Sequence, residues 1–301
     1  MLQLLEMSIP ARQDAIRPLR QVDVRRQFDA AASGFADSAF AHRHCFDGLL
    51  ERLDPMQLDV RRALDLGSAV GAGSRRLAKR YRRARIVSVD LSAAMLREGR
   101  ATRSRFARIA DVQADATALP FATGAFDLAV ANLLFPWITP LHFALSSVAR
   151  VLREGGLFSF ATLGPDSLGS LRDAWRDEDT FEHVNPFPDM HDIGDTLVRA
   201  GFSDPVLDVD RLEVTYRDSA ALFADLTAAG ARNLNRGRRP TLTGKHRMQR
   251  VRTALESNAA DGRVTVELEL VFGHAWGAGP PRTPGEYRVD PGSIGRIRRR
   301  R

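Results

Sequence analysis

The residues Leu64-Asp65-Leu66-Gly67-Ser68-Ala69-Val70-Gly71 decide the fold, together with Asp90, which lies nineteen positions beyond Gly71. A short apolar run ending in Asp and Gly predicts a buried strand followed by a tight turn. Gly67 permits the turn, and Gly71 lets the backbone approach a ligand closely. Asp90 ends a second apolar run, where a carboxylate can accept two hydrogen bonds from ribose hydroxyl groups. NAD-binding proteins use the same logic, and a strand-turn-helix joint without a ligand is a further alternative.

Strands and helices are expected to alternate around this segment. Ser92 is expected to cap the helix that follows Asp90, and Thr139 to cap a helix that Gly155-Gly156 stops. The alternation predicts a parallel sheet with helices on both faces. The expected strands are residues 61–67, 85–90, 109–115, 126–132 and 157–162, and the first helix is 73–81.

The last third of the chain has a different pattern. Residues 166–175 and 190–200 are predicted to be helical, 205–216 extended, and Asp218 to cap a helix that ends near Ala229. Residues 264–272 (VTVELELVF) alternate apolar and polar side chains, which is typical of an antiparallel strand with one solvated face. An antiparallel strand added to a parallel sheet favours a Rossmann-like α/β three-layer sandwich of the class I methyltransferase type.

Two further pieces extend the expected ligand pocket. Gln113-Ala114-Asp115-Ala116 places an acid where it can meet an adenine amino group, and 126–132 supplies a strand that walls the pocket. In this order the pieces resemble the class I S-adenosylmethionine-dependent methyltransferases. The resemblance implies S-adenosylmethionine as methyl donor. The residues expected to bind it are Asp65, Gly67, Ser68, Gly71, Asp90, Leu91, Asp115, Ala116 and Asn132.

Further segments, most of them downstream of Thr162, narrow the resemblance. They are FDAAA (28–32), TLGPDSL (162–168), LRDAW (171–175), HVNPF (183–187), DIGDTLVRAGF (192–202), LTG (242–244) and FGHAW (272–276). With these segments the chain resembles, over roughly residues 22–277, the malonyl-[acyl-carrier protein] O-methyltransferases of biotin synthesis. The resemblance implies that the free carboxylate of a thioester-linked malonyl group is converted to a methyl ester, which primes pimeloyl synthesis.

The chain departs from the pattern at several positions. Ala69 occupies the place of a loop glycine, and if that position needs a positive φ the alanine is strained by about 1 kcal/mol or more. The usual polar residues are altered at Ser68 and Val70. A Tyr-Asp pair expected near the N-terminus reads Phe35-Ala36, which removes a hydroxyl group. A weakened cofactor site is therefore the alternative to an ordinary one.

The expected methyl transfer needs few catalytic groups from the protein. A carboxylate is already nucleophilic at pH 7, so no general base is expected, and no catalytic residue is assigned. A free malonyl carboxylate needs a cation to bind it, and Arg172 is the candidate. Alternatively, Arg172 is a surface residue that forms an ion pair with Asp173 or Asp177. His183 is expected to orient the substrate, or else to be a packed histidine. The seven histidines show no metal-binding spacing, so no metal is expected.

The charge is concentrated. The chain of 301 residues carries a formal +7, but residues 230–253 and 296–301 together carry thirteen positive charges, so the remainder is net −6. We expect Arg236, Arg238 and Arg239 to receive a strongly acidic acyl-carrier protein. A solvated charged face is the alternative. Nucleic acid is a poorer partner because no RNA-binding module or amino-methylating motif is present.

Composition bounds the class of protein. A hydrophobic content of 44% fits a folded globular chain, and the single Cys45 excludes an intramolecular disulfide. No apolar run approaches membrane-span length, and residues 2–9 do not form a convincing signal peptide, so we expect a cytoplasmic protein without membrane partners.

One methyltransferase domain, 22–277, is expected. It would carry N-terminal lid helices at 22–55 and lid insertions near 164–200 and 217–258, between a flexible extension (1–21) and a disordered basic tail (278–301). Two rival functions use the same fold: a protein-modifying relative similar to the complex I assembly hydroxylases, and a non-catalytic assembly factor.

Overall fold

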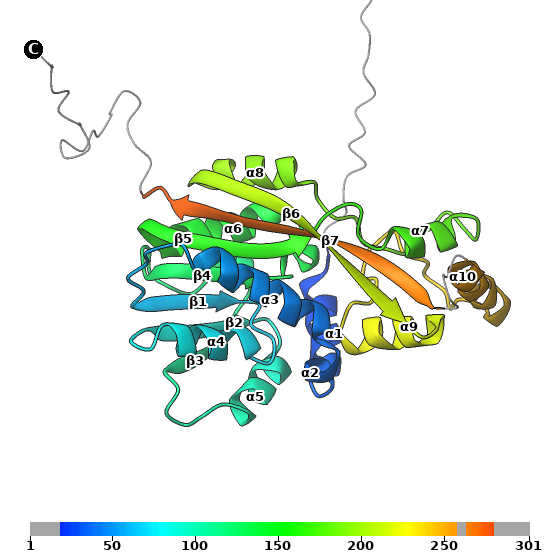
Figure 1. The fold of residues 1–301 in the computed structure, drawn as a ribbon, viewed down its shortest axis with the longest axis horizontal. Helices are drawn as coiled ribbons and strands as arrows, with labels where there is room; N and C mark the ends of the chain where they lie inside the picture. Colours follow the sequence, from blue (N-terminus) through cyan, green and yellow to red (C-terminus); the bar gives the residue numbers. More distant parts are fainter. Residues whose placement is uncertain (1–18, 258–262, 280–301) are drawn as a thin grey trace, which may run out of the picture.

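A computed structural model describes residues 19–257 and 263–279 (Figure 1). Within them the strands are β1 (Arg62–Leu66), β2 (Arg85–Asp90), β3 (Ile109–Gln113), β4 (Phe126–Asn132), β5 (Leu152–Leu163), β6 (Phe202–Tyr216) and β7 (Val264–Gly277). They form one sheet in the order β3-β2-β1-β4-β5-β7-β6. Strands β1 to β5 pair in parallel, and β7 pairs antiparallel with both β5 and β6. The predicted mostly parallel sheet with an antiparallel last strand is confirmed.

Helices cover both faces of this sheet. The α-helices are α1 (Gln21–Ala31), α2 (Phe35–Ser38), α3 (Phe40–Leu53), α4 (Ala72–Arg80), α5 (Ala93–Ala101), α6 (Leu141–Val151), α7 (Gly169–Arg176), α8 (Met190–Arg199), α9 (Ser219–Ala228) and α10 (Lys245–Ser257). Two short 3₁₀ turns, η1 (Ala116–Ala118) and η2 (Phe135–Trp137), follow β3 and β4.

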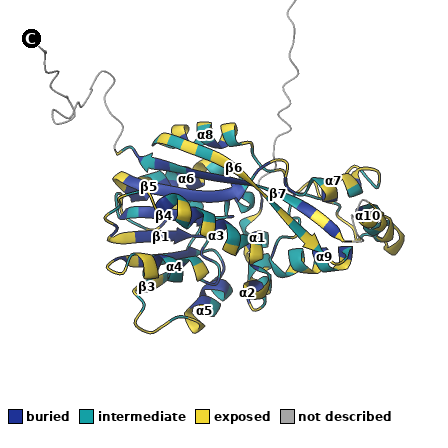
Figure 2. Ribbon diagram, viewed as in Figure 1, coloured by how far each residue is buried: buried dark blue, intermediate teal, exposed yellow. Residues whose placement is uncertain are grey.

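Alternating strand residues divide the apolar core into two layers. Leu64, Ala129 and Phe158 belong to the layer that packs against α6 and α8. Ala63 and Leu128 point to the opposite face, toward α3 and α4. The central strands β1, β4 and β5 are correspondingly dark in Figure 2, whereas the edge strand β6 is largely yellow and teal. This period of two, buried on both sides, produces the predicted three-layer sandwich.

The ends of β6 and β7 run beyond the parallel strands and carry a third apolar cluster. Figure 1 shows α7, α9 and α10 gathered there, away from β1 to β3. We call these three helices the lid. The segment 164–200, predicted to be a single lid insertion, contributes to two parts of the structure. Helix α7 belongs to the lid, whereas α8 packs Ile193 and Leu197 against the sheet. The cluster is formed by Leu171, Trp175, Leu222, Val251, Leu255, Val264 and Val266.

The first turns of three helices show whether the predicted N-cap residues cap them. Ser92 accepts from the Met95 N–H and Asp218 from the Ala221 N–H, so both predicted caps are confirmed. The predicted Thr139 cap is wrong. Helix α6 begins at Leu141 with Pro140 at its N-cap and no side-chain cap, so Thr139 lies one residue too early.

The predicted start of β5 is also wrong. The strand begins at Leu152 and runs through Gly155-Gly156, which were expected to separate the helix from the strand. Gly155 has a φ of +67°, and the pairing of β4 with β5 shifts register between Phe126 and Leu128. Glycine therefore lets the strand bulge there rather than end.

The chain ends lie largely outside the described residues. Helix α1 begins at Gln21, the last residue of the predicted extension, while residues 1–18 and 280–301 of the predicted extension and tail lie outside. Among the residues that the structure describes, no helix has the length and apolarity needed to cross a membrane.

Candidate functional site

The loop after β1 turns through three residues with positive φ. These are Gly67 (+69°), Ala69 (+46°) and Gly71 (+69°). A Cβ at Gly67 would lie 2.8 Å from Cδ1 of Leu134, so both the space and the conformation require glycine. Ala69 adopts the left-handed conformation for which alanine is strained, by about 1 kcal/mol or more. Its N–H donates to Oδ2 of Asp90 over 2.8 Å, which holds the loop against β2.

Asp90 ends β2 with both carboxylate oxygens already engaged. Oδ2 accepts from Ala69, and Oδ1 accepts from the Ser92 N–H over 2.8 Å. Burial raises the pKa of Asp90 to about 6, although the two amide hydrogen bonds act to lower it. Each carboxylate oxygen can accept more than one hydrogen bond, so Asp90 is oriented by the backbone and still has acceptor capacity for a ligand.

A narrow pocket of about 70 Å³ opens where β1, β2 and β4 end. Asp115 lines it with one oxygen engaged by Thr117. The Asn132 amide lines it too. Its Nδ2 donates to the His42 carbonyl over 2.9 Å, whereas its buried Oδ1 has no partner among the described residues. These polar groups, with an orphaned acceptor, suit a ligand that carries ribose, amino and ammonium groups.

Six of the nine predicted cofactor residues line this pocket, namely Gly67, Asp90, Leu91, Asp115, Ala116 and Asn132. The other three do not. Asp65 is buried behind the loop, where it accepts from Ser74 Oγ over 2.5 Å and burial raises its pKa to about 6. Ser68 and Gly71 line a separate small cavity behind the loop.

The N-terminal helices, which the sequence predicts as part of a lid, also line the pocket. The lining residues are Gln21, Val24, Phe28, Phe35 and His42. Phe28 lies in the FDAAA segment and Phe35 stands where a tyrosine is expected, whereas no sequence signal pointed to Gln21, Val24 or His42. Asp29 of α1 accepts from Ser92 Oγ over 2.6 Å and so ties α1 to α5.

A second cavity, of about 510 Å³, lies between the sheet and the lid. Its walls are largely apolar and include Leu171, Trp175, Leu222 and Met248. Three residues, His42, Leu133 and Trp137, line this cavity and also the narrow pocket. The two spaces therefore meet there, and we call these three residues the neck.

Comparisons with known proteins agree with this architecture. A family model described as "Methyltransferase domain" matches residues 64–160. The malonyl-[acyl-carrier protein] O-methyltransferase of Halorhodospira halophila is 42% identical over 92% of this chain and 96% of its own. That of Methylovorus sp. is 41% identical over 84% and 88%. A putative methyltransferase structure from Bacillus halodurans superposes with a TM-score of 0.55 at 16% identity, covering 77% of this chain and 98% of its own.

The chain belongs to the malonyl-[acyl-carrier protein] O-methyltransferase family. The aligned relatives extend past the shared methyltransferase segment and through the lid. Because these relatives are named as methyltransferases, neither a hydroxylase nor a non-catalytic assembly factor is favoured.

The arginines of this O-methyltransferase are distributed unevenly around the cavity. Arg232 and Arg252 line it, and Nε of Arg252 is buried without a partner among the described residues. Arg172, the predicted carboxylate ligand, does not line it. Arg172 is exposed on α7, where it donates to the carbonyls of Pro165 and Ser167 over 3.3 and 3.2 Å. The structure thus does not bring Arg172 to the cavity, and two arginines outside the prediction are there instead.

His183 lines the cavity and is held on two sides. Its ring stacks on Trp175 with the centroids 3.6 Å apart, and Nε2 lies 2.7 Å from Asp179 Oδ1. A histidine fixed in this way shapes the wall of the cavity, which also fits the packed alternative.

The basic segment 230–253 is partly neutralised by the turn after α7. Arg250 binds Glu178 through two hydrogen bonds, of 2.8 and 2.6 Å, and these hold the pKa of Glu178 below its usual value. Arg239 and Arg247 both reach Asp179. Burial acts to raise the pKa of Asp179, but the hydrogen bonds and charges around it lower it overall.

Two of the three predicted docking arginines remain unpaired. Arg236 and Arg238 are exposed, and neither side chain has an ion-pair partner in the described part of the chain, unlike Arg239. Within residues 19–257 and 263–279, no group of three His, Cys, Asp or Glu side chains could hold a metal ion.

Proposed function

We propose that the protein transfers a methyl group from S-adenosylmethionine to the free carboxylate of a malonyl group carried on an acyl-carrier protein. The observation that carries this proposal is the neck, the boundary that a pocket suited to a nucleoside shares with a large cavity under the lid. A donor and an acceptor held in separate spaces with one shared boundary can react in line without exposing the reacting atoms to water.

The narrow pocket supplies the groups that would hold the donor. Asp90 would accept from the ribose hydroxyls, Asp115 from the adenine amino group, and Asn132 Oδ1 would accept the hydrogen bond that the fold leaves unmade. When bound, S-adenosylmethionine supplies an electrophilic methyl group on a sulfonium. Helix α1 lines this pocket through Gln21, Val24 and Phe28 and so covers the place where the donor would bind.

The large cavity supplies the acceptor site. At about 510 Å³ it lies within the usual range of small-molecule sites and exceeds what a malonyl group alone occupies. We infer that it also takes part of the arm that carries the thioester. Arg232 and Arg252, which have no ion-pair partner in the part of the chain that the structure describes, are available there to an anionic substrate.

A single-turnover assay tests this function. Full-length protein mixed with radiolabelled methyl donor and malonyl-carrier protein should yield a base-labile methyl ester. The malonyl methyl ester, which has no free carboxylate, should yield none. Absence of transfer to malonyl-carrier protein by soluble protein that binds the donor would contradict the proposal. Rescue of biotin synthesis in a strain lacking its own enzyme would place the reaction in that pathway.

Substitutions separate the cavity arginines from the predicted one. Arg232→Ala and Arg252→Ala should each raise KM for malonyl-carrier protein by about tenfold, the loss expected for one charged hydrogen bond. Arg172→Ala is the matched control, because its guanidinium contacts only nearby carbonyls in the described structure. A larger increase in KM for Arg172→Ala than for the two cavity variants would mean that Arg172 binds the malonyl carboxylate after all.

Docking of an acidic carrier protein is proposed for Arg236 and Arg238. The double reversal R236E/R238E should raise KM for malonyl-carrier protein by about tenfold or more at low salt, and should leave KM for malonyl-pantetheine unchanged. R82E/R83E is the control, since these exposed arginines precede β2 at the opposite end of the sheet. Equal effects on both substrates would remove the docking surface.

A further inference from the structure

The neck contains one side chain able both to donate and to accept hydrogen bonds. Of its three residues, Leu133 has no polar side-chain atom and Trp137 can only donate, whereas His42 can do both. His42 lies in the first turn of α3, in the chain segment that closes over the narrow pocket. His42 therefore lies on the boundary between the donor and acceptor spaces.

His42 is fixed in place while its ring stays unpaired. Its carbonyl accepts from Asn132 Nδ2 over 2.9 Å, which ties it to the end of β4. Its ring meets Phe35 edge to face, with the centroids 4.9 Å apart. Neither ring nitrogen has a hydrogen-bond partner among the described residues. His42 is half-buried and lines both spaces, so its unpaired N–H is available to a ligand in the neck.

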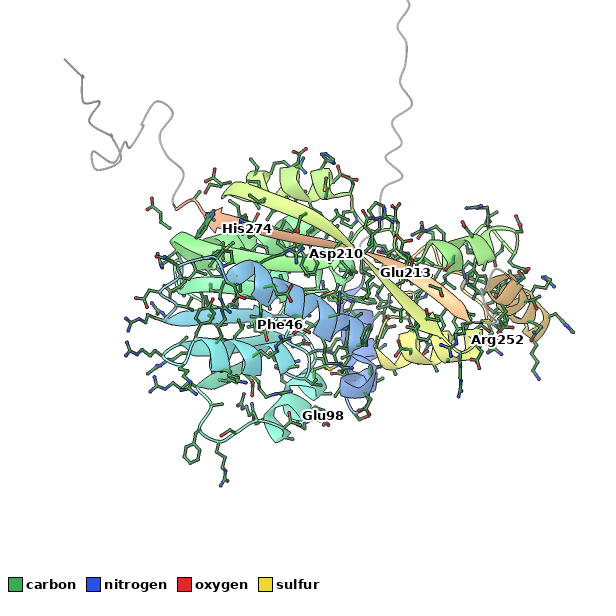
Figure 3. The ribbon with its side chains drawn as sticks, in the orientation of Figure 1. Phe46, Glu98, Asp210, Glu213, Arg252 and His274 are labelled. Carbon is green, nitrogen blue, oxygen red and sulfur yellow. The ribbon has the colours of Figure 1, made fainter. Side chains whose placement is uncertain are left out.

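The ring is uncharged at neutral pH. Burial, helped by the neighbouring charge of Arg43, lowers the pKa of His42 to about 4. It therefore acts as a neutral donor, in contrast to the cations Arg232 and Arg252 farther along the cavity wall. Figure 3 places Arg252 on the lid, away from the parallel strands that end at the narrow pocket.

We propose that the imidazole N–H of His42 donates a hydrogen bond to the acceptor carboxylate and turns its second oxygen toward the methyl group. This inference rests on the proposed function. In the transfer, the free carboxylate oxygen forms a bond to the methyl carbon as the carbon–sulfur bond breaks, and that bond's electron pair returns to sulfur. No proton moves, and one negative and one positive charge disappear together.

The loss of charge explains why a neutral donor suits this position. Reactants are more highly charged than the transition state, so a full cation against the carboxylate would stabilise the reactants more and slow the step. A neutral N–H also orients the carboxylate, but it stabilises the charged reactants less than a cation would and so slows the step less. The arginines can then attract the substrate from a distance while His42 sets the geometry of attack.

Two variants test this role. His42→Leu removes the donor, and His42→Gln restores a neutral N–H donor of similar reach. We expect His42→Leu to lower the single-turnover rate with malonyl-carrier protein by about tenfold to a hundredfold, the range for one positioned donor. His42→Gln should recover most of that loss. Affinity for S-adenosylhomocysteine, measured by calorimetry, should stay within about twofold in both, as expected when no hydrogen bond to the nucleoside is lost.

A binding measurement separates this inference from the function itself. In the complex saturated with S-adenosylhomocysteine, malonyl-pantetheine should bind His42→Leu about tenfold more weakly than the wild type, and His42→Gln nearly as well as the wild type. Equal rates for His42→Leu and a wild type that turns over would overturn the His42 assignment alone. Equal loss in Leu and Gln variants would reduce His42 to a packing residue. No turnover by the wild type would instead overturn the proposed function.

Discussion

The two spaces that meet at the neck are built in opposite ways. The narrow pocket is formed by strand ends and tight turns, and its polar groups are already held by backbone amides, as Asp90 is by Ala69 and Ser92. The large cavity is walled largely by side chains of the lid, and Arg232 and Arg252 line it without an ion-pair partner among the described residues. The first is pre-organised for one ligand, whereas the second depends on how separate helices pack. Substitutions in the wall of the large cavity should therefore change the affinity for the acceptor without lowering the affinity for the donor.

Removing the carboxylate of Asp90 should have the largest effect on ligand binding, and this effect should be on the donor pocket. Asp90→Ala deletes the ribose acceptor and releases the loop at Ala69, so affinity for S-adenosylhomocysteine should fall about a hundredfold, as for loss of charged hydrogen bonds worth about 3 kcal/mol. Asp65→Asn is the matched control, because Asp65 lies behind the pocket and bonds to Ser74. Unchanged affinity in Asp90→Ala, measured by calorimetry, would mean that the pocket is misplaced.

Filling the cavity should separate the two spaces. Met248 lines the cavity from α10, and Met248→Trp should raise KM for a malonyl thioester by about tenfold, since overpacking a site costs about 1–3 kcal/mol. Donor affinity should not change. Steady-state kinetics with calorimetry on the same sample measure both. A parallel loss of donor binding would show that the cavity and pocket are one unit.

Weakening the attachment of the lid should have a moderate effect. Asp179→Asn removes the charge that Arg239 and Arg247 share, and Tm at pH 7 should fall by about 2–4 °C. The pKa of Asp179 is lowered in the folded protein, so its contribution is present above its unfolded pKa and is lost as pH falls through the folded value.

The difference in Tm between Asp179→Asn and the wild type should therefore shrink as the pH falls and vanish below the folded pKa of Asp179, where the carboxylate is protonated in both states. The control is Asp173→Asn, since Asp173 forms only an exposed ion pair with Arg176 in the described structure. A Tm difference that does not shrink as the pH falls would mean that the side chain acts by packing rather than by charge.

Relieving the strained loop should have the smallest effect. Ala69→Gly removes the Cβ from a residue with a φ of +46°, and stability should rise by about 0.5–1 kcal/mol after the entropy cost of glycine. Denaturant unfolding measures this change. A loss of stability would show that the methyl group of Ala69, which packs near Phe35 and Met95, contributes more than the strain costs.

The parallel half of the fold could be predicted because its signals are local. Strand ends, turn glycines and caps at Ser92 and Asp218 each depend on neighbours within a few residues. The Thr139 cap failed for a local reason as well, since a proline intervened. Six of the residues expected to bind the cofactor line the narrow pocket, and the same short motifs pointed to them. Asp65 did not, because the side chains of a strand alternate and Asp65 points behind the loop.

The sequence by itself determined the succession of strands and helices along the parallel half of the chain, the strained turn at Ala69 and the place of Asp90, because each depends on backbone conformation over a few residues. Only the tertiary structure decided the neck, the pairing of Glu178 with Arg250 across 72 positions, and the exclusion of Arg172 from the cavity. Those features depend on which faces of distant helices meet, and helix packing is set by the whole apolar surface rather than by any one motif.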